Sequence, residues 1–208
     1  MTEEPVRRRK KKAKRDEHLV RTFCALTLDP ETTAILREAL NKTHHSLSRS
    51  FSWVRPESWH ITIKFFGDVP QSELSRISDS LKVIAASTGP VPVDLRAVGA
   101  FPDMRTPKLL WTGVQELGKA RRLEGLYRDV NLSAKRMGYA EETRRFKPHV
   151  TLARAKGSTH YPVARELTPL MDTAFHSTVL RKLVLFKSVR GQDGAEYTPL
   201  FIHPLSES

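Results

Sequence analysis

A histidine and a threonine stand two residues apart in two separate segments of this chain. One segment, WHITIKFF, contains His60 and Thr62, and the other, PHVTLARA, contains His149 and Thr151. Both segments have the pattern of strands, in which successive side chains point to opposite faces. The histidine and the threonine of each segment therefore share one face, while the apolar residue between them points into the core.

The first segment continues this alternation over several residues. It predicts Ile61, Ile63 and Phe65 on the core face, and Lys64 on the same face as His60. A single His-x-Thr segment is more often a polar surface pair than a functional site. Two copies with the same alternation, 89 residues apart in a basic chain, favour a shared function.

Two imidazoles and two hydroxyls that meet across a cleft suit the opening of a phosphodiester ring. The unperturbed pKa of histidine lies near neutrality, so one imidazole can take a proton from the attacking water while the other protonates the departing alkoxide. A hydroxyl donates a hydrogen bond to the phosphoryl oxygens, on which negative charge develops. We expect no metal ion and no other cofactor, because these groups suffice and no carboxylate stands beside either histidine.

The elements that must position these segments alternate between strands and helices. Asp29-Pro30 is typical of a helix start, with an N-cap aspartate followed by proline at the first helical position. Apolar residues at spacings of three and four predict two further helices, from about Leu74 to Gly89 and from about Leu117 to Met137. Strands are predicted over 19–28, 60–67, 91–101, 108–114 and 149–154, with a closing hairpin around RGQDG. The pattern predicts an α+β fold with helix-linked strands in both halves, whereas residues 155–174 support no clear prediction.

Positive charge is concentrated at the N-terminus. Residues 1–18 hold eight Lys or Arg and four Asp or Glu, so they contribute +4 of the net charge of +12, and the remaining chain carries +8. This first segment has almost no apolar residue, so we expect a disordered tail that either improves solubility or binds RNA without sequence preference. Both parts of the chain are basic, which favours a polyanionic partner.

Five blocks of the sequence, in order, resemble the 2H phosphoesterase superfamily and within it the RNA 2′,3′-cyclic phosphodiesterases. They are RTFCALTLDP, SWVRPESWHITIKFFGDVP, GAFPDMRTPKLLWTGV, FKPHVTLAR and LFKSVRGQDGAEYTPL. The resemblance covers residues 21–205 and implies two pseudo-symmetric lobes, each an antiparallel sheet with flanking helices, around a central cleft. A single bilobal domain over residues 19–208 would then follow the tail, which is not part of the usual family pattern.

The resemblance also implies a role for each residue of the two motifs. His60 corresponds to the proton donor to the leaving O3′, and His149 to the proton acceptor that activates water. Thr62 and Thr151 would hold the phosphoryl oxygens, and Arg154 would add a cationic contact to the phosphate. Strand alternation alone places Arg154 on the face opposite His149, so it reaches the cleft only if the strand ends, bulges or twists there. Otherwise it is an ordinary surface arginine.

The resemblance implies hydrolysis of a terminal 2′,3′-cyclic phosphate of RNA to a 2′-phosphate. Two alternatives remain open: the reverse reaction, which joins RNA ends through a 2′-5′ link, and a non-catalytic RNA-binding module. Phe23 and Phe66 are expected either in the core or stacked on a base. We expect a monomer without membrane association, located in the cytoplasm, or in the nucleus if the basic tail acts as an address in a eukaryote.

Overall fold

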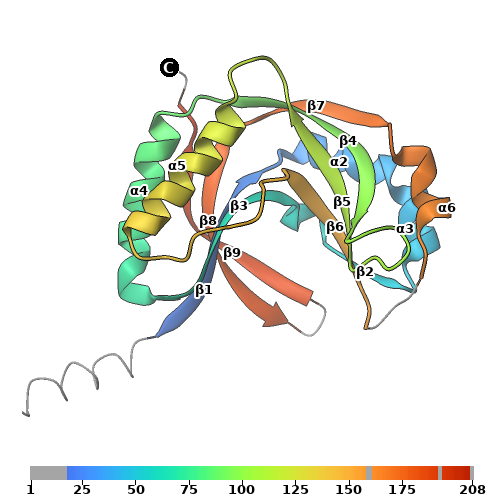
Figure 1. The fold of residues 1–208 in the computed structure, drawn as a ribbon, viewed down its shortest axis with the longest axis horizontal. Helices are drawn as coiled ribbons and strands as arrows, with labels where there is room; N and C mark the ends of the chain where they lie inside the picture. The colour runs from blue at the N-terminus through green and yellow to red at the C-terminus, as the bar shows by residue number, and fades with distance from the viewer. Residues whose placement is uncertain (1–17, 158–160, 192–193, 207–208) are drawn as a thin grey trace, which may run out of the picture.

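The computed structural model describes residues 18–157, 161–191 and 194–206, so the predictions for the basic tail fall outside the described residues except at His18. Figure 1 shows strands that form a curved central layer with helices on either side. The strands are β1 (Leu19–Thr27), β2 (Phe51–Trp53), β3 (His60–Pro70), β4 (Val91–Phe101), β5 (Leu109–Glu116), β6 (His149–Ala155), β7 (Ala174–Leu180), β8 (Lys182–Gly191) and β9 (Gly194–Pro204). The helices are α2 (Pro30–Ala39), α3 (Asn41–Leu47), α4 (Leu74–Ala86), α5 (Arg122–Arg136) and α6 (Ala164–Leu167). The predicted α+β class is confirmed.

The strands are arranged almost symmetrically about the centre of the sheet. Their order is β7-β4-β5-β6-β3-β1-β8-β9, and β2 pairs with β6 outside this path. The paired strands are antiparallel, and β3 and β6, which carry the two His-x-Thr segments, meet at the centre through the pair Ile61 and Val150. The predicted two-lobed arrangement is therefore present as two halves of one hydrogen-bonded sheet.

The helices cover the two halves separately. Helices α4 and α5 pack against each other beside β3, β8 and β9, whereas α2 packs on β7 and α3 on α6 (Figure 1). The apolar stripe of each long helix faces inward: Leu74, Ile77, Leu81 and Ala85 of α4, and Leu123, Leu126, Val130 and Ala134 of α5, are buried. Both amphipathic helices thus bury their apolar faces on the same half of the sheet. Within the described residues, no helix is both long and apolar enough to span a membrane.

Helix starts follow local capping chemistry. The side chain of Asp29 accepts a hydrogen bond from the Thr32 backbone N–H at 2.8 Å, which confirms the predicted start of α2. Helix α5 begins at Arg122, later than predicted, because the carboxylate of Glu116 accepts hydrogen bonds from the N–H groups of Arg122 and Leu123 and caps the helix there. The prediction missed this cap because Glu116 lies six residues earlier, at the end of β5.

Candidate active site

The two His-x-Thr segments lie side by side at the centre of the sheet. Ile61 and Val150 pair across β3 and β6, and both are fully buried. Continuing this antiparallel register by one residue places His60 opposite Thr151, and His149 opposite Thr62. All four of these side chains are half-buried on the opposite face from the Ile61–Val150 pair. The structure therefore brings together the two imidazoles and the two hydroxyls that the sequence analysis singled out.

A bulge in β3 changes the alternation immediately after Thr62. On β1, Cys24 pairs with Lys64 and Ala25 with Thr62, so Ile63 has no partner of its own. Ile63 and Lys64 consequently both point inward, and Lys64 is only 5% exposed while Phe65 is 60% exposed. The prediction that Phe65 lies in the core and Lys64 beside His60 was therefore wrong. The buried ammonium of Lys64 donates a hydrogen bond to the carbonyl oxygen of Ala140.

The same bulge recurs in β6 and decides the position of Arg154. On β5, Leu110 pairs with Ala153 and the next residue pairs with Thr151, so Leu152 is skipped and both Leu152 and Ala153 are fully buried. The extra inward residue turns Arg154 to the face that carries His149. This is the irregularity that the strand needed for Arg154 to reach the cleft. Arg154 and Phe65 are thus equivalent residues of the two halves, each five positions after its histidine.

Backbone carbonyl groups orient both imidazoles in the same way. Nδ1 of His60 lies 2.7 Å from the carbonyl oxygen of Ser58, and Nδ1 of His149 lies 2.7 Å from that of Lys147. Because a carbonyl oxygen only accepts, Nδ1 carries the proton in both rings. Nε2 of each neutral imidazole then has a free lone pair. In this state it can act as a base, or it can first be protonated and then act as an acid.

Burial makes both imidazoles weak bases in the free protein. It lowers the pKa of His60 to about 4, with a smaller contribution from the positive charges of Arg154 and His149, while the hydrogen bond to Ser58 opposes the shift. Burial also lowers the pKa of His149, again with a contribution from Arg154. Arg154 is therefore close enough to act electrostatically on both rings.

Aromatic side chains enclose the histidines. The ring of His60 lies 5.0 Å from that of Phe23 and contacts Tyr197 edge-on at 5.2 Å. On the other side, Phe101 contacts the ring of His149 edge-on at 5.4 Å. These rings contribute to the burial that lowers both pKa values.

Both aromatic residues considered for base stacking, Phe23 and Phe66, belong to the core. Phe23 is 2% exposed, and Phe66 is 9% exposed and packs edge-on against Tyr139. The exposed aromatic residue of this site is Phe65, whose ring centre lies 5.7 Å from that of Phe23. Sequence reasoning missed Phe65 because regular alternation buries it. The sequence did hold one signal for Phe65: it lies as far from His60 as Arg154 lies from His149, which indicates equivalent positions in the two halves.

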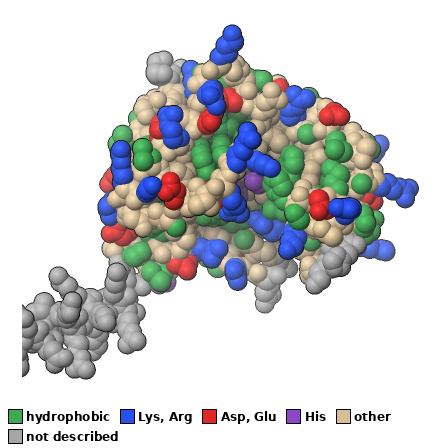
Figure 2. Space-filling model, viewed as in Figure 1, with side chains coloured by type: hydrophobic (Ala, Val, Ile, Leu, Met, Phe, Trp, Pro, Cys, Tyr) green, Lys and Arg blue, Asp and Glu red, His purple; other side chains and the backbone are tan. Residues whose placement is uncertain are grey.

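The site opens at the surface and retains unpaired hydroxyls. Figure 2 shows a hollow in the middle of this face, with a histidine side chain visible in it and Lys and Arg side chains around it. Within the described residues, the hydroxyls of Thr62 and Thr151 have no hydrogen-bond partner, so both remain available to a ligand. In the same part of the chain, no three His, Cys, Asp or Glu side chains are grouped so as to hold a metal ion.

Sequence comparisons relate the chain to phosphoesterases. The family described as "LigT like Phosphoesterase" matches residues 26–111. A protein of Archaeoglobus fulgidus named RNA 2′,3′-cyclic phosphodiesterase is 32% identical over 183 residues, which is 87% of this chain and 98% of that protein. One of the same name from Aeropyrum pernix is 32% identical over 149 residues, 71% of this chain and 82% of that protein. Another, from Geobacillus stearothermophilus, is 29% identical over 171 residues, 80% of this chain, and the match spans only about half, 51%, of its own length.

Solved structures share the fold. The crystal structure of TT0787 of Thermus thermophilus superimposes with a TM-score of 0.74 at 25% identity and covers 89% of this chain and 97% of that one. Escherichia coli LigT in its apo form superimposes with a TM-score of 0.66 at 20% identity, over 91% of this chain and 99% of that one. The symmetric sheet therefore belongs to a fold that solved proteins also adopt.

Proposed function

Because the chain belongs to the LigT-like phosphoesterases, a family of hydrolases, we propose that it hydrolyses the 2′,3′-cyclic phosphate at the end of an RNA chain to a 2′-phosphate. The observation that carries this proposal is the pair of His-x-Thr strands that meet at Ile61 and Val150, with an arginine on the same face. Relatives at 32% identity that bear the name RNA 2′,3′-cyclic phosphodiesterase support the choice of substrate.

The proposed reaction uses the two Nε2 atoms as acid and base. Nε2 of His149 takes a proton from water as the water oxygen attacks phosphorus. The bond from phosphorus to O3′ breaks, and O3′ receives a proton from Nε2 of His60. The phosphate then remains on O2′, and the two imidazoles have exchanged their protonation states, which solvent restores.

The remaining groups of the site would stabilise the charge that develops on phosphorus. The hydroxyls of Thr62 and Thr151 would donate hydrogen bonds to the two non-bridging oxygens, and Arg154 would place a positive charge beside them. Since these groups stabilise the transition state without an ion, we propose that the reaction is independent of metal.

Substrate binding would prepare His60 for its role as an acid. In the free protein the pKa of His60 is about 4, so the ring is neutral at about pH 7. A bound phosphodiester anion beside Nε2 favours the imidazolium form and raises this pKa. The proton is thus taken up with the substrate, and the unliganded site avoids two neighbouring positive charges at His60 and Arg154.

We further propose that residues 19–208 act as one catalytic unit. One histidine comes from each half of the sheet, and the core residues Ile61 and Val150 join the halves between them. Neither half alone holds both an acid and a base.

The proposal is tested with the full-length protein and a short RNA that ends in a 2′,3′-cyclic phosphate, incubated with EDTA. We expect conversion to the 2′-phosphate by the wild type and none by His149→Ala. His45→Ala, which changes an exposed histidine of α3, serves as the control and should retain full activity. A 3′-phosphate product, or turnover by His149→Ala equal to that of the wild type, would contradict the mechanism.

A further inference from the structure

A cavity adjoins the candidate active site on the side of Arg154. It has a volume of about 760 Å³ and lies between α3, the paired edge of β2 and β6, and the ends of β8 and β9. Arg154 lines this cavity, and its positive charge also acts on both imidazoles. The cavity is therefore continuous with the face on which the proposed reaction occurs, and its volume falls in the range of ligand pockets.

The charge of this cavity suits an anion. Arg154, Lys156 and Arg190 line it, and none of its described lining residues is acidic. The Lys156 ammonium donates a hydrogen bond to the Ser48 carbonyl oxygen at 2.9 Å, which holds this positive charge at the end of α3. Three cations and no acidic side chain occur among the described lining residues, and such a set favours phosphate groups.

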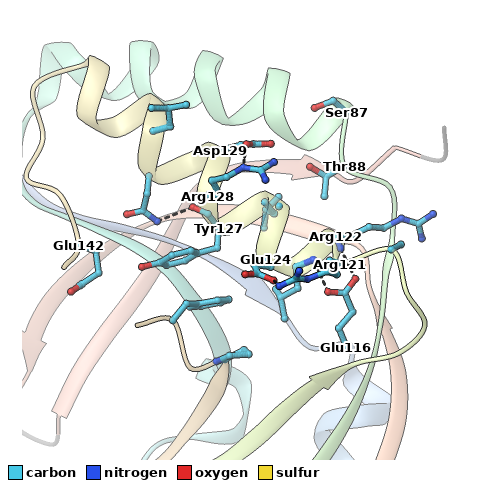
Figure 3. A pocket seen from close by; sticks show the side chains of 18 of the residues that line it. Ser87, Thr88, Glu116, Arg121, Arg122, Glu124, Tyr127, Arg128, Asp129 and Glu142 are labelled. Atoms are coloured by element: carbon cyan, nitrogen blue, oxygen red, sulfur yellow. Dashed lines mark hydrogen bonds and ion pairs between the residues drawn. The ribbon is translucent and has the colours of Figure 1, made fainter. Parts of the chain in front are cut away.

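A larger groove elsewhere on the molecule has nearly equal numbers of basic and acidic residues. The groove over α5, drawn in Figure 3, has a volume of about 1130 Å³ and is lined by six Lys or Arg and five Asp or Glu. Its charges are satisfied locally: Arg121 pairs with Glu124, and Arg128 pairs with Asp129 at 3.1 Å. This groove is nearly neutral despite its arginines, so the basic cavity beside Arg154 is the better path for a nucleic acid.

The cavity also contains aromatic surface. The rings of His44 and Trp53 line it with their centres 4.9 Å apart. Sites for single-stranded nucleic acids combine a positive surface that follows the backbone with rings on which bases stack. Both features occur here within one cavity.

We propose that this cavity binds the nucleotide that precedes the cyclic end of the RNA, with the internucleotide phosphate held by Lys156 and Arg190. This inference rests on the proposed function and adds a second binding position to the same site. An RNA strand would then lie across Arg154, with its cyclic phosphate between the histidines and its next phosphate in the cavity. The protein would prefer an oligonucleotide to a cyclic mononucleotide, which reaches only the first position.

The test compares a hexanucleotide that ends in a 2′,3′-cyclic phosphate with cytidine 2′,3′-cyclic phosphate as substrates. Arg190→Glu is the test variant, and Arg128→Glu introduces the same charge change in the groove over α5. Both proteins keep the N-terminal tail, so its contribution to RNA binding cancels. We expect Arg190→Glu to lower kcat/KM about tenfold more for the hexanucleotide than for the mononucleotide, as the loss of a charge-assisted phosphate contact implies. Arg128→Glu should leave the ratio of the two values at its wild-type level.

Direct binding separates this inference from the proposed function. The affinity of a fluorescent hexanucleotide that ends in a 2′-phosphate is measured by anisotropy at several salt concentrations. Arg190→Glu should weaken binding and reduce the dependence on salt by about one phosphate contact. Absence of hydrolysis by the wild type would refute the proposed function alone. Equal hexanucleotide affinity in the wild type and Arg190→Glu, or an unchanged substrate ratio, would refute the cavity as an RNA site.

Discussion

The half-buried imidazole of His60 makes the stability of the protein depend on pH in a way that can be measured. Its pKa is about 4 in the folded state and about 6.5 in the unfolded chain. Between these values the unfolded chain binds more protons at this residue than the folded protein does, so stability falls as the pH falls. The full difference of about 2.5 pKa units corresponds to about 3 kcal/mol in the free energy of unfolding. Most of this stability, about 2 kcal/mol, is lost when the pH falls from about 7 to about 4.5.

The measurement is the free energy of unfolding in urea at these two pH values for the wild type and for His60→Gln. Glutamine removes the titrating group, so the wild type should lose about 2 kcal/mol more than the variant on acidification. His45→Gln, which alters an exposed histidine of α3, should lose as much as the wild type. The other carboxylates and histidines titrate in all three proteins, and their contributions cancel in the comparison.

The result that would refute this reasoning is an equal loss of stability in the wild type and His60→Gln. It would mean that His60 titrates near its unfolded value and that the surrounding rings do not exclude water from it. Inorganic phosphate offers a second check, because an anion beside Nε2 should raise the pKa of His60 in an NMR titration. A pKa that stays the same or falls on addition of phosphate would show that the anion does not bind next to this ring.

Three further predictions concern other parts of the molecule. Arg154→Ala should raise the pKa of both His60 and His149 in an NMR titration and raise KM, whereas an unchanged pKa in both rings would remove Arg154 from the site. Gly99→Ala should destabilise the protein by about 1–3 kcal/mol in thermal unfolding, because the added Cβ would lie 2.3 Å from the indole of Trp111, and wild-type stability would show that this ring moves freely. Deletion of residues 1–18 should weaken RNA binding and its salt dependence while hydrolysis of a cyclic mononucleotide persists, and an unchanged RNA affinity would show that the tail does not contact RNA.

Much of the fold and the core of the site followed from local patterns in the sequence. The alternation in the two His-x-Thr segments placed His60 and Thr62 on one face, as it did His149 and Thr151, because side-chain direction in a regular strand depends only on position. The start of α2 followed from Asp29 and Pro30, whose side chains act within a few residues. The elements of residues 155–174 and the short strand β2 were not predicted, because they have little periodicity of their own and are defined by their neighbours in space.

The tertiary structure decided what depends on pairing between distant strands. The register of β1 against β3, and of β5 against β6, leaves Ile63 and Leu152 unpaired, and no local pattern in the sequence encodes this. These two bulges turn Phe65 and Arg154 toward the site against the expected alternation, since one extra residue moves every following side chain to the other face. The lowered pKa values of the histidines likewise depend on burial by residues from other strands. Sequence alone thus determined which groups can perform the chemistry, and long-range pairing determined which other side chains face them.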